Sequence, residues 1–131
     1  MPTLHESGML ARRFWELMAS NDFHSVAKIL HSDFVLGWPQ SGERIRGAFN
    51  FGEMNANYPA AGRWEFSIER LVADDNGAVT EVTVTDGEIV ATAVTFFTVR
   101  DGKIHRIVEY WPEPFEPRPD RRQWVELAGK D

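Results

Sequence analysis

The 131-residue sequence contains no cysteine, which excludes a disulfide framework and a thiolate metal site. No apolar run approaches the roughly 20 residues that are needed to span a bilayer. The opening, MPTLHESGML, lacks both the basic start and the apolar run of a secretory signal. These absences predict a cytoplasmic protein that has no membrane partner.

Metal-binding patterns are missing as well, because none of the four histidines is spaced as part of a ligand set. His105 and Glu109 are four residues apart on an expected strand. That spacing separates them by roughly 13 Å, at about 3.3 Å per residue, which is too far for one ion. We therefore expect neither a metal nor a cofactor.

The net charge of −6 argues against a nucleic-acid backbone as the main partner. The chain is 43% hydrophobic and 26% charged, which is typical of one compact globular domain. A neutral or weakly charged small molecule is the class of ligand that this composition leaves open.

The first third of the chain predicts helices. Leu10, Phe14, Leu17 and Met18 follow helical spacing, and Ser7 precedes them as a candidate N-cap. A second, short helix is expected after Asp22, which is of a residue type that caps helices.

A brief strand, DFVLGWP, follows and is expected to end at Pro39. A third helix is expected after Gly47, and Pro59 stops it. The N-terminal part therefore contains three expected helices.

From Arg63 onward the hydrophobic period changes to two. Turn signals at 74–77, 86–87 and 101–102 divide this part into four strand-like segments, which predicts an antiparallel meander. The fold class is α+β, with the helices covering one face of a curved sheet.

The two Asp-Gly pairs predict the register, because two-residue hairpin loops would place position 100 opposite 103 and position 85 opposite 88. Glu109 then faces Val94, Trp111 faces Thr92, and Thr92 faces Glu81. A four-residue first turn places Arg70 opposite Glu81. The same face is expected to include Trp64, Phe66, Ile68, Val72, Val79, Phe96 and Ile107.

This face is predicted to point inward, because the opposite face carries Glu65, Ser67 and Glu69 on the first strand. Glu109 would then lie between sheet and helices, near Trp38 and Trp111.

The opposite, outer face is expected to be partly apolar and to form a homodimer interface. Its expected apolar members are Val82, Val84, Ala93, Phe97, Val99, Val108 and Tyr110. The alternative is that the proline-rich tail at 112–131 folds back over this face, with Phe115 and Trp124 as plugs.

Five segments together resemble the SnoaL-like, or polyketide cyclase-like, branch of the nuclear-transport-factor-2-like (NTF2-like) superfamily, over residues from about 8 to 112. They are RFWELMASND (13–22), HSDFVLGWP (31–39), RG (46–47), VRDGKI (99–104) and EYW (109–111). The resemblance implies a single domain over 1–131 with the cystatin-like, cone-shaped barrel of that superfamily. It also implies a deep pocket and often a dimer through the outer sheet face.

The known chemistries of this superfamily do not transfer to the chain. A ketosteroid-isomerase-like site would have an aspartate at position 38, a tyrosine at 14 and an acid at 95, where this sequence has Trp38, Phe14 and Thr95. An epoxide-hydrolase-like site needs charges on a strand that here reads IVATAVTFFTV. The cyclases commonly have an aspartate where this chain has Pro112.

Glu109 remains as the candidate general acid/base, with Glu81 second. A carboxylate walled by Trp, Phe and Val is expected to have a pKa raised toward neutrality. Both residues also have a structural interpretation: Glu109 as a strand-end group that binds backbone N–H groups or a helix N-terminus, and Glu81 as the ion-pair partner of Arg70.

A cavity for a flat apolar ligand is the expected site, with the alternative that the same residues form a packed core. Its expected lining residues are Trp38, Tyr58, Trp64, Phe66, Arg70, Thr92, Phe96 and Trp111. Two functions stay open: a cofactor-free isomerase, cyclase, hydrolase or dehydratase acting on a cyclic or aromatic substrate, and a noncatalytic hydrophobic-ligand-binding or dimeric interaction protein.

Overall fold

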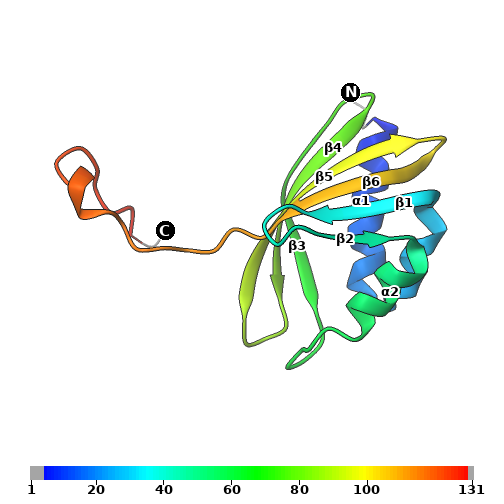
Figure 1. The fold of residues 1–131 in the computed structure, drawn as a ribbon, viewed down its shortest axis with the longest axis horizontal. Coiled ribbons are helices and arrows are strands. Elements are labelled where there is room, and N and C mark those ends of the chain that lie inside the picture. The colour runs from blue at the N-terminus through cyan, green and yellow to red at the C-terminus, as the bar shows by residue number, and fades with distance from the viewer. Residues whose placement is uncertain (1–4, 130–131) are drawn as a thin grey trace.

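The computed structural model describes residues 5–129 and shows one curved sheet with helices packed against its inner face (Figure 1). The sheet has six strands in the order β2-β1-β6-β5-β4-β3. In chain order the elements are α1 (Glu6–Ala19), the 3₁₀ helix η1 (Phe23–Ile29), β1 (Leu30–Trp38), β2 (Glu43–Arg46), α2 (Ala48–Ala56), β3 (Glu65–Ala73), β4 (Gly77–Thr85), β5 (Val90–Arg100), β6 (Lys103–Tyr110) and the 3₁₀ helix η2 (Pro119–Arg121).

The expected α+β class is confirmed, but the expectation of three N-terminal helices is only partly right. Only α1 and η1 precede the sheet, and η1 is a 3₁₀ helix. Strands β1 and β2 come before α2, and the short β2 was not predicted because its sequence, ERIR, has one apolar residue. Residues 1–4 and 130–131 of the expected domain and tail lie outside the described part.

Helix α1 begins at Glu6 rather than after Ser7. The Ser7 hydroxyl is buried and donates hydrogen bonds to the backbone oxygens of Asp74 and Gly77, at 2.5 and 2.9 Å. Ser7 therefore joins the helix to the β3–β4 turn instead of capping the helix.

The predicted meander of β3 to β6 is confirmed, and β1 joins it by pairing in parallel with β6. Strands β2 and β3 are the two edges of the sheet, so the cone is open rather than a closed barrel. This topology places the end of β1 beside the end of β6, where Glu109 lies.

The predicted register is right at Arg100 opposite Lys103 and wrong farther along the same hairpin. Val99 pairs with Ile104, whereas Thr98 pairs with Arg106, so His105 is an extra residue in β6. Because side chains alternate between faces, one extra residue reverses the faces of the neighbouring strand.

The β4–β5 turn is also longer than expected, since Thr85 pairs with Val90 rather than with position 88. The Asp86 carboxylate accepts the backbone N–H groups of Glu88 and Ile89, both at 3.0 Å, and that of Ala61 at 2.8 Å. These three bonds hold the pKa of Asp86 below its ordinary value and stabilise the four-residue loop.

The structure corrects the expected faces of β4 and β5. Four residues that were expected on the outer face are buried in the core: Val82, Val84, Ala93 and Phe97. Phe96, which was expected inside, is 43% exposed, and Val79, Glu81 and Thr92 alternate with the buried positions on the same outer side. On β3 an extra residue, Glu69, leaves Phe66 and Ile68 inside and turns Val72 outward.

Phe14 lies at the centre of the core, between the helices and the sheet. Its ring contacts Trp15 of α1, Phe51 of α2 and Phe97 of β5, with centroid distances of 4.9, 5.8 and 5.2 Å. Such tilted and edge-on contacts add to the stability that burial supplies.

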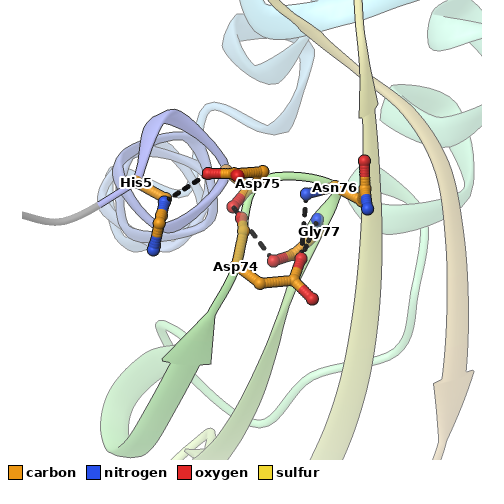
Figure 2. A network of polar contacts seen from close by, with 6 residues as sticks. His5, Asp74, Asp75, Asn76 and Gly77 are labelled. Carbon is orange, nitrogen blue, oxygen red and sulfur yellow. Dashed lines mark hydrogen bonds and ion pairs between the residues drawn. The ribbon is translucent and has the colours of Figure 1, made fainter.

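Gly77 lies where β4 begins and where the backbone of β5 approaches closely. The Asp74 carboxylate fixes this turn by accepting the N–H groups of Asn76 and Gly77, at 2.8 and 3.0 Å (Figure 2). A Cβ atom at position 77 would overlap the carbonyl oxygen of Phe97. The position therefore requires glycine.

We expect Gly77→Ala to lower the free energy of unfolding by about 1–3 kcal/mol, because backbone atoms must move to accommodate the methyl group. Urea unfolding measures the loss. Gly37→Ala in β1 is the matched control, since a Cβ there meets no atom within 4 Å, and its effect should stay below about 0.5 kcal/mol. Equal losses in the two variants would contradict the packing argument.

Candidate functional site

Glu109 lies on the inner face of β6, 5% exposed, and accepts hydrogen bonds from three neutral side chains. The indole N–H groups of Trp38 and Trp111 donate to Oε1, at 3.0 and 3.1 Å. The hydroxyl of Thr95 donates to Oε2, at 2.7 Å. No ion pair to Glu109 occurs within residues 5–129. The carboxylate is therefore fixed by uncharged donors.

The strand order explains how the two tryptophans reach one oxygen atom. Trp38 ends β1, which runs parallel to β6 with Gly37 opposite Val108, so Trp38 lies beside Glu109. Trp111 follows two residues after Glu109 and therefore returns to the same face. The Gln40 side chain holds the backbone of Trp111 by accepting its N–H (2.5 Å) and donating to its carbonyl oxygen (3.2 Å).

Glu109 is the last member of a buried polar row that crosses the inner face of the sheet. Thr80 pairs with Thr95, and Thr95 pairs with Glu109, on three adjacent strands. Both threonines are fully buried, and the indole of Trp15 donates to Thr80 Oγ1 at 3.0 Å. The threonine part of this row was missed because the predicted register placed both residues on the opposite face.

Burial raises the pKa of Glu109, and the hydrogen bonds from Trp38, Thr95 and Trp111 oppose that rise. The same geometry serves the protonated form. A proton on Oε2 can be donated to Thr95 Oγ1, while Oε1 still accepts from both indoles. Glu109 can therefore gain and lose a proton without losing its hydrogen-bond partners.

This raised pKa predicts a pH-dependent stability. The folded protein holds the Glu109 proton more tightly than the unfolded chain, so stability falls as the pH rises from the ordinary value near 4.5 through the raised folded pKa. Glu109→Gln keeps a neutral side chain at every pH. We therefore expect the unfolding free energy of the variant to increase relative to that of the wild type as the pH rises through this range. Urea unfolding at several pH values measures this difference. Parallel pH profiles would show that Glu109 titrates normally.

The structure does not bring the second candidate acid to this site. Glu81 lies opposite Val94 on the outer face and forms an ion pair with Arg70, at 2.6 Å. Thr92 and Phe96 also lie on that face. The expected placement of these four residues beside Glu109 is wrong, because the extra residue in β6 reverses the faces of β4 and β5.

The remaining expected lining residues lie on or near the inner side. Trp64 and Phe66 are half-buried against the core, and Phe66 packs on Trp15 with a centroid distance of 5.5 Å. Tyr58 lies beyond α2 and is exposed, with its ring 6.2 Å from that of Trp64.

Two cavities of about 260 and 400 Å³ lie along β1 and β6. The smaller one includes Trp38 in its lining, and neither lining includes Glu109. In the described part of the chain no three His, Asp or Glu side chains gather in a way that suits a metal ion. No helix among these residues is long and apolar enough to cross a membrane.

The fold and this carboxylate define a small α+β cone protein with an acidic group on the inner face of its sheet. The chain belongs to the SnoaL-like domain family, whose family model matches residues 11–123. A comparison with curated proteins gives no match.

Solved structures confirm the NTF2-like fold. A proposed ketosteroid isomerase from Kribbella flavida DSM 17836 is 32% identical, with a TM-score of 0.87 over 96% of this chain and 92% of that one. An NTF2-like protein of unknown function from Burkholderia xenovorans LB400 is 29% identical, with a TM-score of 0.75 over 95% and 96%. An epoxide hydrolase from M. tuberculosis, 24% identical over 82% and 83% of the two chains, shares the fold with a TM-score of 0.66.

Proposed function

We propose that this protein is a cofactor-free acid/base enzyme of the SnoaL-like family that moves a proton on a small cyclic or aromatic substrate. Glu109 is the proton-transfer group. The observation that carries the proposal is a buried carboxylate with a raised pKa, held by three neutral donors. A general base works best when its pKa approaches the operating pH, and burial supplies that shift here.

The hydrogen bonds assign different tasks to the two oxygens. Oε1 is held by the indoles of Trp38 and Trp111, whereas Oε2 has a single partner, Thr95. Neither cavity reaches Glu109, so the proposed step requires the half-buried indole of Trp38 or Trp111 to move aside and admit the substrate. Ionised Oε2 then removes a proton from the carbon next to a substrate carbonyl. The same atom then returns the proton to another position of the substrate, which completes an isomerisation without net gain or loss of protons.

The resemblance to ketosteroid isomerases supports this choice of reaction. Two positions that carry acids in such sites are Trp38 and Thr95 here, and both side chains contact Glu109. In this chain the carboxylate that lies between these two positions is that of Glu109, on β6. The similarity to the proposed Kribbella flavida ketosteroid isomerase points to the same class of chemistry.

The second candidate function is ligand binding or dimeric interaction without catalysis. It is favoured by one observation: this chain has Trp38, Thr95 and Pro112 at the positions where catalytic members of the superfamily are expected to have acids. Either function is compatible with a homodimer through the outer sheet face, which we propose on its exposed apolar residues. The exposed residues are Val72, Phe96 and Tyr110, and the half-buried Val79 and Val94 lie between them.

Deuterium exchange tests the proposal without knowledge of the natural substrate. Cyclic ketones and enones are incubated with the protein in D₂O, and incorporation next to the carbonyl is followed by mass spectrometry. Catalysed exchange in at least one compound class is expected. Ligands that stabilise the protein but show no exchange above the buffer rate would favour the binding function.

A further inference from the structure

The C-terminal tail, residues 112–129, leaves the body of the protein and is exposed along its whole length (Figure 1). No hydrogen bond or ion pair joins residues 113–129 to the rest of the described chain. The tail nevertheless carries large apolar side chains, among them Phe115 (81% exposed) and Trp124 (74%). Such exposure is typical of a segment that binds another molecule.

The direction of the tail is set by local structure. Gln40 holds Trp111 at the exit point, and Pro112, Pro114 and Pro117 stiffen the chain that follows. Proline-rich chain favours the extended polyproline II conformation, which advances about 3.1 Å per residue. The first part of the tail is therefore expected to be extended.

The tail also belongs to the architecture that relatives share. The match to the Kribbella flavida protein covers 96% of this chain, and the remaining 4% of 131 residues is about five. The match therefore includes most of the tail. The family match likewise continues to residue 123.

A groove with apolar and basic side chains lies on the outer side of β2, β1 and β6, and we call it the basic groove. Its apolar floor includes Val35 and Val108, and it comprises the two adjoining cavities of about 260 and 400 Å³. Four arginines line the cavities: Arg44, Arg46, Arg100 and Arg106. None of the four forms an ion pair within the described residues, although Asp33 and Glu43 also line the groove and the chain as a whole is acidic.

The first part of the tail, PEPFEP (112–117), complements this groove. Glu113 and Glu116 are three residues apart, which is one turn of polyproline II, so they lie on one side of the segment about 9 Å apart. Phe115 lies next to Glu116. With three residues per turn, the Phe115 ring projects about 120° away from the side that carries the two acids, so the segment presents an acidic side and an aromatic side next to each other. These two sides are complementary to a groove that has arginines and an apolar floor.

We propose that the tail of one copy binds the basic groove of a second copy of this chain. Phe115 packs on Val35 and Val108, and Glu113 and Glu116 pair with arginines of the groove. The inference goes beyond the proposed enzyme activity and does not depend on it, because none of these residues is a hydrogen-bond partner of the Glu109 carboxylate. It adds a specific segment to the proposed homodimer.

Two charge-reversal variants test the exchange of tails. The tail variant carries Glu113→Arg and Glu116→Arg, and the groove variant carries Arg44→Glu and Arg106→Glu. Each variant alone opposes like charges, so we expect its dimer Kd in sedimentation equilibrium to rise at least about tenfold. An equimolar mixture pairs each tail with a complementary groove, and its Kd should return to within about threefold of the wild type.

Three outcomes would overturn the proposal. Dimers that survive both reversals but dissociate in Phe96→Asp would show that the outer apolar face alone joins the copies. A mixture that does not recover would show that each tail binds its own groove or another molecule, and a monomeric wild type would exclude the second copy as the partner. Circular dichroism of each variant confirms that it is folded, and the deuterium-exchange assay, which does not depend on the tail, tests the enzyme activity separately.

Discussion

Glu109→Gln is expected to lower the rate of catalysed deuterium exchange by about 10²–10⁴-fold while the protein stays folded. Glutamine has nearly the same shape, so its oxygen accepts from Trp38 and Trp111 and its amide donates to Thr95. What it lacks is a group that accepts a proton near neutral pH. The loss should therefore appear in the rate and leave ligand affinity almost unchanged.

Glu81→Gln is the matched control for this result. Glu81 lies on the outer face in an ion pair with Arg70, so its replacement should leave the exchange rate within about twofold of the wild type. An equal loss in the two variants would indicate a general effect on the fold. Full activity of Glu109→Gln would remove Glu109 from the mechanism.

Glu109→Leu is expected to have the largest effect on stability, a loss of about 2–4 kcal/mol in the free energy of unfolding. Leucine fills a similar volume but leaves the indole N–H groups of Trp38 and Trp111 and the Thr95 hydroxyl without their acceptor. Unsatisfied buried donors are costly because they have given up hydrogen bonds to water.

Urea unfolding at about pH 5 is the suitable measurement. Glu109 carries less negative charge there than at neutral pH, so its ionisation affects the comparison with the uncharged leucine and glutamine least. Glu109→Gln serves as the control and should differ from the wild type by less than about 1 kcal/mol, since it keeps both indole bonds and replaces the Thr95 bond by one of opposite direction. A leucine variant as stable as the glutamine variant would show that the three donors find other partners, for example water.

Much of the fold could be predicted from the sequence because its signals are local. The helical spacing of Leu10, Phe14, Leu17 and Met18 and the turn residues at 74–77, 86–87 and 101–102 depend only on neighbours in the chain. The inward orientation of Glu109 followed from alternation along β6 and is right.

The register could not be predicted because it depends on single inserted residues. His105 in β6 reverses the faces of β4 and β5, and Glu69 in β3 restores Phe66 to the inner side. Nothing in the composition of these strands marks the two bulges, since both residues are polar and compatible with an edge or a turn. The lining predicted for the site therefore included Phe96 and Thr92 and omitted Thr95 as a partner of Glu109.

The contacts of Glu109 were also beyond local pattern reasoning. The pairing of Trp38 with Glu109 depends on the parallel β1–β6 pair, which joins residues 71 positions apart. A position for Trp38 near Glu109 is predictable from the sequence, but the sharing of one carboxylate oxygen by two indole N–H groups is not. Long-range strand pairing determines that arrangement.

The most direct test of the account is to follow the protonation of Glu109 and the exchange rate in the same pH series, from about pH 4 to pH 9. The carboxyl carbon of Glu109 is observed by ¹³C NMR and assigned by its absence in Glu109→Gln. The account predicts one titration, displaced above the ordinary value near 4.5, with the exchange rate rising at the same midpoint. A Glu109 that titrates at or below its ordinary value, or an exchange rate with a different midpoint, would contradict it.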